Sequence, residues 1–288
     1  MIKINDLKSK KPIKRIEKNG KSIIIDNGEK TVYKEGYIDN EILDYLKSRN
    51  FEYMPNIKNN GLYYTMNYIK SLNIPNEQKI IDLIKITSLL HNKTTHYKEI
   101  DLDYYNKLYE DIYNNIEYLY SYYTDLITLI EAKVFPSPSE QLLERNISKI
   151  YEVLEYNEKK LRQWHTLVKN KTKERKVIIH GNLKIDNFIR NKNSYLISWD
   201  KTKIASPIFD LYKLYQNHAL DFDFTHLLKI YENNYPLTKD EKELLFILIN
   251  MPDKLKLNKN EYENCKKISK SLDRIYKTEK LILPETSK

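Results

Sequence analysis

The sequence has one cysteine, Cys265, only five glycines and no long apolar run. A single cysteine excludes a disulfide within the chain and a cysteine-rich metal cluster. The longest apolar stretches fall far short of the ~20 residues that a membrane-spanning helix needs. The basic opening, MIKINDLKSKKPIKRIEK, is not followed by an apolar segment and a small-residue cleavage site. We therefore expect a cytoplasmic protein that has no membrane span.

The sequence has fewer acidic than basic residues: 40 Asp and Glu compared with 49 Lys and Arg, which gives a net charge of +9. Such an excess can indicate nucleic acid or an anionic surface as a partner. Here the lysines occur in short clusters, such as KSKKPIKR and KTKERK, between apolar segments. Clusters of this kind are typical of solvated loops and helix faces. Nucleic-acid binding is therefore the least favoured function.

The first quarter of the chain predicts a small sheet. Three β-prone segments come first, at 12–18, 21–26 and 29–35. Asn19-Gly20 and Asn27-Gly28 separate them, and Asn-Gly between β-prone segments is the strongest short signal for a hairpin. A helical pattern over 39–50 follows, with a further turn and strand in 56–69. The expected order is β-β-β-α-β-β.

Beyond Ile69 the apolar pattern is almost entirely helical. Helices are expected at 76–91, at 101–135 and from about Glu140 to Val168, with a break at the PSPS sequence. In the first of these, Thr87 alone interrupts the apolar stripe. The two long segments could form a coiled coil. Packing within a helical lobe is favoured, because many apolar positions are tyrosine and the spacing departs from a strict heptad.

The segment 177–214 carries the residues that point to a function. It contains HGNLKIDN at 180–187, ISWD at 197–200 and SPIFDL at 206–211. These sequences resemble the aminoglycoside phosphotransferase and choline kinase group of the protein-kinase-like fold, and within it the bacterial spore-coat CotS-type proteins. That family has His-Gly-Asp, four residues and Asn, then Ile-Asp-Trp or Ile-Asp-Phe with an acidic residue, then Asp-Pro, two residues and Asp-Leu.

The resemblance implies an α+β, two-lobed fold. A small lobe, 1–68, would hold the sheet and one helix, and a mostly helical large lobe, 69–288, would hold the catalytic-loop region 177–214. It places Lys34, in TVYK, at the position of the lysine that binds the α- and β-phosphates of ATP, with Glu41 as its ion-pair partner. LLHNKTTHY, at 89–97, is similar to the Leu-His that ends the first large-lobe helix of the family.

Two carboxylates of the family are missing, because Asn182 and Ser198 stand at their positions. In the family the loop aspartate orients or accepts the proton of the attacking hydroxyl, while the loop asparagine and a second aspartate hold Mg²⁺. The chain keeps that asparagine, as Asn187. Only "KNG" occurs in the first hairpin, so the glycine-rich loop that cradles phosphates is also missing.

Nearby residues could compensate for these losses. Asp200 lies two residues after Ser198 and could take the metal, Asp186 could approach a hydroxyl, and Lys184 could lie near the γ-phosphate. By resemblance, Asp200 already has a counterpart in the family, so it is the expected neighbour and no replacement. Structural roles are expected for two further residues: His180 would pack beneath the loop, and Asp210 would accept loop N–H groups.

Two functions remain in view. The first is a pseudokinase that acts as a binding or scaffold protein, associated with the forespore or spore coat by resemblance. The second is a divergent ATP-dependent kinase that phosphorylates a hydroxyl of a small molecule. Binding of ATP and Mg²⁺ is possible in both. The partner, a small molecule or a protein, is not identified by the sequence.

Overall fold

A computed structural model describes residues 14–20, 22–101 and 103–286. Most of the basic opening, 1–18, lies outside these residues. The expectation that it carries no signal sequence therefore stays a prediction. The chain divides into two compact units. Unit 1 comprises Met1–His96, Arg175–Leu214 and His226–Pro236, and unit 2 comprises Tyr97–Glu174, Tyr215–Thr225 and Leu237–Lys288. The lobe boundary expected after residue 68 falls inside unit 1 and stays a prediction.

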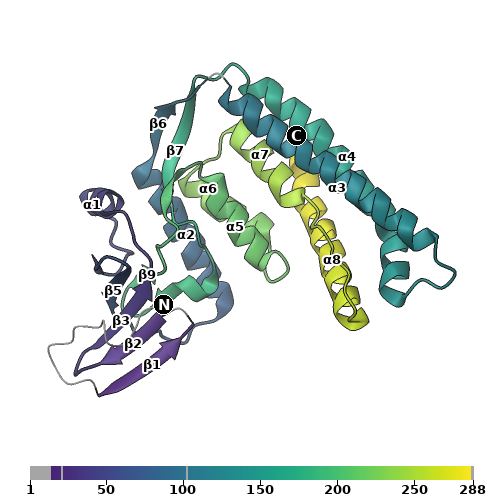
Figure 1. Ribbon diagram of the computed structural model, residues 1–288. Coiled ribbons are helices and arrows are strands. Elements are labelled where there is room, and N and C mark those ends of the chain that lie inside the picture. Colours follow the sequence, from purple (N-terminus) through teal and green to yellow (C-terminus); the bar gives the residue numbers. More distant parts are fainter. Residues whose placement is uncertain (1–13, 21, 102, 287–288) are drawn as a thin grey trace. The chain divides into compact units, whose positions relative to one another are not determined.

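Unit 1 begins with an antiparallel five-stranded sheet in the order β1-β2-β3-β5-β4. Its strands are β1 (Arg15–Asn19), β2 (Ser22–Asp26), β3 (Lys30–Glu35), β4 (Ile57–Asn59) and β5 (Tyr63–Asn67) (Figure 1). The two Asn-Gly turns form the first two hairpins, and Gly20 and Gly28 have positive φ angles of 58° and 103°. The expected order β-β-β-α-β-β is confirmed.

Helix α1 (Asn40–Ser48) joins β3 to β4. Asp39 caps its start, because Oδ1 accepts the backbone N–H of Glu41 at 2.9 Å. Leu43 and Leu46 are the buried residues of the helix. Glu41 precedes Leu43 by two positions, about 200° around a helix, so it lies on the opposite, exposed side. The orientation of α1 therefore directs Glu41 away from the core.

Helix α2 (Asn76–Thr94) supplies the next part of the core of unit 1. Its predicted apolar stripe is buried, and so is Thr87, whose hydroxyl donates to the carbonyl of Leu83 at 2.9 Å. The residue that interrupts the stripe is thus satisfied by the helix backbone.

The remaining elements of unit 1 carry the candidate loop. They are the 3₁₀ helix η2 (Ile185–Asn187), the hairpin β8 (Phe188–Arg190) and β9 (Ser194–Leu196), and β10 (Lys203–Ala205). Strand β10 pairs with β7 (Lys173–Ile179), which with β6 (His96–Glu99) completes a three-stranded sheet. Helices α5 (Ile208–His218) and α6 (Phe224–Asn234) follow, of which residues 215–218 and 224–225 belong to unit 2. Trp199 is fully buried and packs edge-on against Phe51, with ring centroids 6.0 Å apart.

Unit 2 is mostly helical and contains α3 (Tyr104–Glu131), α4 (Pro138–Val168), α7 (Lys239–Asn250) and α8 (Glu261–Thr286) (Figure 1). Helix α4 packs on the other three, and Leu143, Ile150, Leu161 and Trp164 form its buried stripe. Among the described residues, no helix is long and apolar enough to cross a membrane.

The break expected at PSPS is placed differently in the structure. Helix α4 starts at Pro138, two residues before the predicted start. Proline is favoured at the first position of a helix because its missing N–H has no partner there. Ser137 and Glu140 form a capping box, in which the Glu140 side chain accepts the N–H of Ser137 at 2.8 Å. Helix α3 ends at Glu131, before the predicted end at residue 135, so the PSPS sequence begins α4 but does not end α3.

Candidate functional site

Asp210, at the start of α5, ties the loop 180–187 to the core of unit 1. Its side chain is fully buried. Oδ2 accepts the backbone N–H of His180 at 2.7 Å, and Oδ1 accepts that of Gly181 at 2.8 Å. Hydrogen bonds to a charged acceptor are stronger than those to a neutral one. This geometry favours the interpretation of Asp210 as a brace for the loop.

His91 contacts Asp210 directly, and Tyr231 in turn contacts His91. His91, near the end of α2, has Nε2 3.2 Å from Asp210 Oδ2 and Nδ1 2.6 Å from the hydroxyl of Tyr231 on α6. All three side chains are fully buried. A neutral imidazole fits both contacts when Nε2–H donates to the carboxylate and the tyrosine hydroxyl donates to Nδ1. The carboxylate on α5 therefore connects the loop to α2 through His91, and to α6 through Tyr231.

His180 is fully buried beneath the loop. Burial lowers its pKa, because the charged imidazolium would lose its hydration. The neutral ring donates from Nε2 to the carbonyl of Ile197 at 2.9 Å and accepts the N–H of Asn182 at Nδ1, at 3.3 Å. Its ring packs edge-on against Trp199 at 4.7 Å. Both nitrogens are thus engaged in structure, which argues against a role in proton transfer.

Gly181 allows the loop to lie directly on the chain that follows Trp199. Its φ angle is +74°, and an added Cβ would lie 2.2 Å from the carbonyl oxygen of Lys201. No other residue fits without a shift of backbone. The glycine of the His-Gly sequence is therefore required by this close approach.

Asn182 and Asn187 are brought together within the loop. The amide of Asn187, which is 5% exposed, donates from Nδ2 to the carbonyl of Asn182 at 2.7 Å. The backbone carbonyl of Asn187 accepts the N–H of Ile197 at 2.9 Å. Because Nδ2 is the donor in this bond, Oδ1 is the atom of the amide that could accept a hydrogen bond or bind a cation.

Ser198 lies between the loop and Trp199 with a φ angle of +70° and is 8% exposed. A non-glycine residue with positive φ is uncommon, and Asn and Asp adopt this conformation more readily than Ser. Residues held in such conformations are concentrated at functional sites. The backbone at Ser198 therefore has a conformation that Asp adopts more readily than Ser.

Lys34 is paired with Asp200 across unit 1. Its Nζ lies 2.6 Å from Asp200 Oδ1, and the two side chains are only 12% and 23% exposed. Tyr64, directly opposite Lys34 on β5, donates its hydroxyl to the same oxygen at 3.4 Å. Burial, and next the charge of Asp200, raise the pKa of Tyr64 far above its usual value, so it remains a donor. The sheet and the ISWD segment thus meet at one ion pair.

The ion pair expected between Lys34 and Glu41 is not formed. Among the described residues, the ammonium of Lys34 has Asp200 as its carboxylate partner. Glu41 instead lines a cavity of about 560 Å³ in unit 1, together with Tyr45 and Ile204. The physical reason is the rotation of α1, which buries Leu43 and leaves Glu41 on its outer side. A role for Glu41 in nucleotide binding stays a prediction.

Lys184 and Asp186 lie at the exposed edge of the loop. Lys184 Nζ is 3.5 Å from Asp186 Oδ2, and the two side chains are 39% and 82% exposed. A surface pair of this kind contributes about 0–1 kcal/mol to stability. The carboxylate of Asp186 is therefore directed to solvent and to Lys184.

The part of the chain that the structure describes contains no group of three or more His, Cys, Asp or Glu side chains that could hold a metal ion. The metal ligands predicted from the sequence are one carboxylate, Asp200, one amide, Asn187, and one hydroxyl, Ser198. Mg²⁺ is usually held by one or two carboxylates together with phosphate oxygens. This set fits a metal that depends on a phosphate ligand.

Sequence reasoning missed the contacts of Tyr64 and Tyr231. Tyr64 could have been found from the pairing of β3 with β5, which sets it opposite Lys34. Tyr231 gives no local signal, because its partner His91 is 140 residues away.

Comparison with solved structures identifies the fold. Neither family models nor curated proteins match the sequence. Among solved structures, an aminoglycoside phosphotransferase from Alicyclobacillus acidocaldarius aligns with a TM-score of 0.66 at 10% identity, over 96% of this chain and 90% of its own. A spectinomycin phosphotransferase, APH(9)-Ia, in complex with AMP gives 0.56 at 12% identity, over 92% and 93%. A glucosamine kinase in complex with glucosamine, ADP and phosphate gives 0.53 at 11%, over 94% and 80%. The chain therefore has the protein-kinase-like fold of the aminoglycoside phosphotransferases, with a small antiparallel sheet and a mostly helical remainder.

Proposed function

We propose that the chain is a pseudokinase, a kinase-like protein with impaired phosphoryl transfer that acts by binding. The observation that carries the proposal is the loop 180–187. Asp210 and Asn187 hold this loop by hydrogen bonds, and it carries Asn182 where the resembled family has its catalytic aspartate. A loop that is held in place but has a neutral residue at the catalytic position supports ligand binding without phosphoryl transfer.

The amide of Asn182 cannot take up a proton near neutral pH. Loss of general-base assistance lowers a rate by about 10²- to 10⁴-fold, or about 3–5 kcal/mol of barrier. The loop carboxylate, that of Asp186, does not replace the missing general base, because its side chain is 82% exposed and paired with Lys184.

Metal binding is weakened at the second position. Ser198 is a neutral donor, and Mg²⁺ prefers carboxylate and phosphate oxygens. Asp200 is the carboxylate at hand, but it is already paired with Lys34 at 2.6 Å. In the proposal, Asn187 and Asp200 would hold Mg²⁺ weakly. The metal would neutralise the charge of the phosphates only when a nucleotide is bound.

Nucleotide binding is part of the proposal. Lys34 lies on β3 with its ammonium held near the ISWD segment, where it could contact phosphate oxygens. Solved proteins of this fold contain AMP or ADP, as the spectinomycin phosphotransferase and glucosamine kinase structures show for those proteins. Contacts to the adenine do not depend on the metal, so binding can persist when transfer is lost.

One observation favours the second candidate, a divergent kinase that phosphorylates a small-molecule hydroxyl. Asp200 lies beside the lysine of the phosphate site, so a metal held by Asp200 would be close to the phosphates that Lys34 contacts. In that case Asp200 replaces the carboxylate lost at Ser198. The two proposals differ in turnover, and binding alone does not separate them.

The test measures Mg·ATP binding by calorimetry and ADP release with a panel of amino sugars and amino alcohols. We expect no turnover above background in the wild type and a gain of about 10²-fold or more in Asn182→Asp/Ser198→Asp. Asn114→Asp/Ser121→Asp is the matched control, because it adds the same charge at two exposed positions of α3. Robust wild-type turnover that Asp200→Ala abolishes would establish the divergent kinase instead.

A spore-coat association is also a proposal, and it rests on the CotS-type resemblance alone. In a spore-forming host, the chain should be extracted with the coat fraction of purified spores and detected there by immunoblotting. Detection only in the cytosol of vegetative cells would count against it.

A further inference from the structure

A basic cavity of about 630 Å³ lies in unit 2, between the end of α5, the segment 253–256 and α8. Its size is typical of small-molecule sites. We propose that this cavity binds a small, multiply charged anion, with a phosphate ester as the chemical class. The charged lining side chains are five basic residues and two acidic ones: Lys254, Lys256, Lys267, Lys270 and Arg274, with Asp221 and Asp253.

One wall of the cavity is a single face of α8. Lys267, Lys270, Ser271 and Arg274 follow the spacing i, i+3, i+4, i+7, which places their side chains in one row along a helix. Three positive charges therefore point to the same side of a rigid element. A row of like charges is unfavourable unless an anion lies against it.

The opposite wall is irregular in structure but firmly held. The hydroxyl of Tyr122 donates to the carbonyl of Leu255 at 2.6 Å, and that of Tyr123 donates to the carbonyl of Asp253. The ammonium of Lys254 lies 4.5 Å from the ring centroids of both Tyr118 and Tyr122. The tyrosines of α3 thus fix this segment, so the wall is formed before any ligand arrives.

Both carboxylates of the lining already have a partner. Asp253 Oδ1 lies 2.8 Å from a guanidinium nitrogen of Arg274, and Asp221 Oδ2 lies 3.0 Å from Nδ1 of His218. Among the described residues, Lys256, Lys267 and Lys270 have no carboxylate partner in the structure. These three lysines provide the net positive charge that an anion would meet.

Ser271 is the second, independent sign of a ligand. Its side chain is 4% exposed, and within the described residues its Oγ has no hydrogen-bond partner. A helical serine usually donates to the carbonyl four residues earlier, and buried hydroxyls are almost always paired. A rotation about χ1 that turns the buried Oγ towards the cavity would allow a ligand oxygen to satisfy this hydroxyl. Ser, Lys and Arg together are the side chains that commonly contact phosphate.

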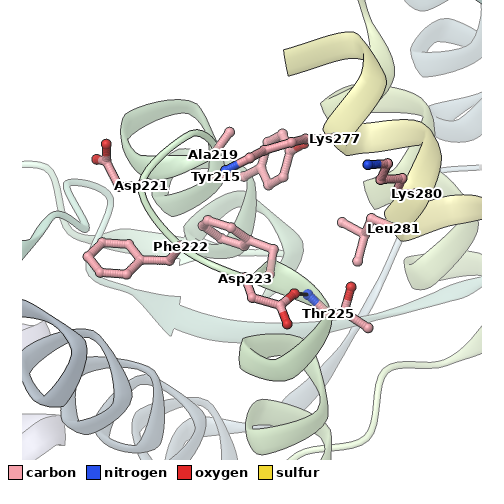
Figure 2. Close-up of a pocket in the computed structure, with 10 residues that line it drawn as sticks. Tyr215, Ala219, Asp221, Phe222, Asp223, Thr225, Lys277, Lys280 and Leu281 are labelled. Atoms are coloured by element: carbon pink, nitrogen blue, oxygen red, sulfur yellow. Dashed lines mark hydrogen bonds between the residues drawn. The ribbon is translucent and has the colours of Figure 1, made fainter. Parts of the chain in front are cut away.

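The neighbouring cavity shows that this charge pattern is local. A cavity of about 380 Å³ shares Ala219 and Asp221 with the basic one (Figure 2). The charged residues that line it are Lys277, Lys280, Asp221 and Asp223, so its positive and negative charges balance. Lys277 also donates to the carbonyl of Leu220 at 2.7 Å. The second cavity therefore offers no comparable attraction to an anion.

The experiment titrates the full chain with pyrophosphate, and separately with citrate, by calorimetry. We expect one equivalent of pyrophosphate to bind, and Lys267→Gln/Lys270→Gln to weaken binding by about tenfold or more. The matched control is Lys107→Gln/Lys159→Gln, which removes two exposed lysines elsewhere in unit 2 and should change the Kd by less than about twofold. Ser271→Ala should weaken pyrophosphate binding, with circular dichroism and the Tm confirming that each variant is folded.

Four outcomes would overturn the proposal. These are no saturable binding at millimolar pyrophosphate, equal weakening in the two double variants, binding lost in Lys34→Gln but kept in Lys267→Gln/Lys270→Gln, and citrate bound as tightly as pyrophosphate. The second indicates unspecific attraction, and the third places the anion at the phosphate site of unit 1. The fourth removes the assignment to phosphate.

Discussion

Asp210→Asn should destabilise unit 1 strongly, because one carboxylate serves two backbone donors. An asparagine oxygen can replace only one of its oxygens, and the NH₂ group then faces a backbone N–H of the loop. One buried donor loses its acceptor, at about 1–3 kcal/mol, and the other bond loses its charge, at about 1 kcal/mol. The contact of His91 with Oδ2 is also weakened. The expected loss is about 3–5 kcal/mol.

The chain allows this loss to be measured in one unit. Its two tryptophans, Trp164 and Trp199, lie in unit 2 and unit 1 respectively, and both are buried. In a Trp164→Phe background, the fluorescence change on urea unfolding reports unit 1 alone. The amides of His180 and Gly181 should exchange with solvent more than about 100-fold faster in Asp210→Asn.

Asp186→Asn is the matched control, because it makes the same chemical change at an 82% exposed position of the same loop. It should alter the free energy of unfolding by less than about 0.5 kcal/mol. If Asp210→Asn lies within about 1 kcal/mol of this control, the carboxylate is not the anchor of the loop and the reasoning fails.

Three further predictions concern the same region. Gly181→Ala should lower the free energy of unfolding by more than about 2 kcal/mol, through its positive φ and the carbonyl of Lys201, and a Tm equal to that of the wild type would contradict this. Because burial lowers the pKa of His180, the unfolded chain takes up a proton at this residue first as the pH falls. The free energy of unfolding is therefore at its full value above about pH 6.5 and declines below it by up to about 1.4 kcal/mol per pH unit. Urea unfolding at pH 7.5 and 5.5 should show a smaller decline in His180→Gln, and an unchanged decline would refute the assignment. A double-mutant cycle with Lys34→Met and Asp200→Asn should give a coupling energy of about 1–3 kcal/mol, whereas additive effects would show that the pair is not formed in solution.

Local signals were enough to predict the sheet and the helices. The two Asn-Gly turns between β-prone segments fixed the first hairpins, because few other sequences adopt the positive φ that such turns need. Periodicity found α2 even though Thr87 interrupts it, since its hydroxyl bonds within the helix. The boundary of α4 was missed because Pro138 can either end or begin a helix, and only the capping box at Ser137 decides.

The partner of Lys34 could not be predicted from local signals. Asp200 is 166 residues away, and its approach depends on how the ISWD segment packs against the sheet. The choice of Glu41 followed the resemblance, although the buried pattern of α1 argues against it: Leu43 faces inward, and Glu41 is about 200° away. Conversely, the interpretation of Asp210 as a brace for the loop followed from the resemblance of SPIFDL, and its hydrogen bonds to the N–H groups of His180 and Gly181 favour that interpretation.

The division of the chain into two units bears on how the protein folds during synthesis. Unit 1 needs residues 226–236, including Tyr231, in addition to its first 96 residues. Contacts such as that between His91 and Tyr231 therefore cannot form until most of the chain has left the ribosome, and long-range contacts of this kind slow folding. Truncation after residue 96 or 174 would leave both units incomplete, so a shortened chain is expected to be aggregation-prone. The nascent chain thus has a long interval in which the sheet and α2 expose apolar surface and would benefit from a chaperone.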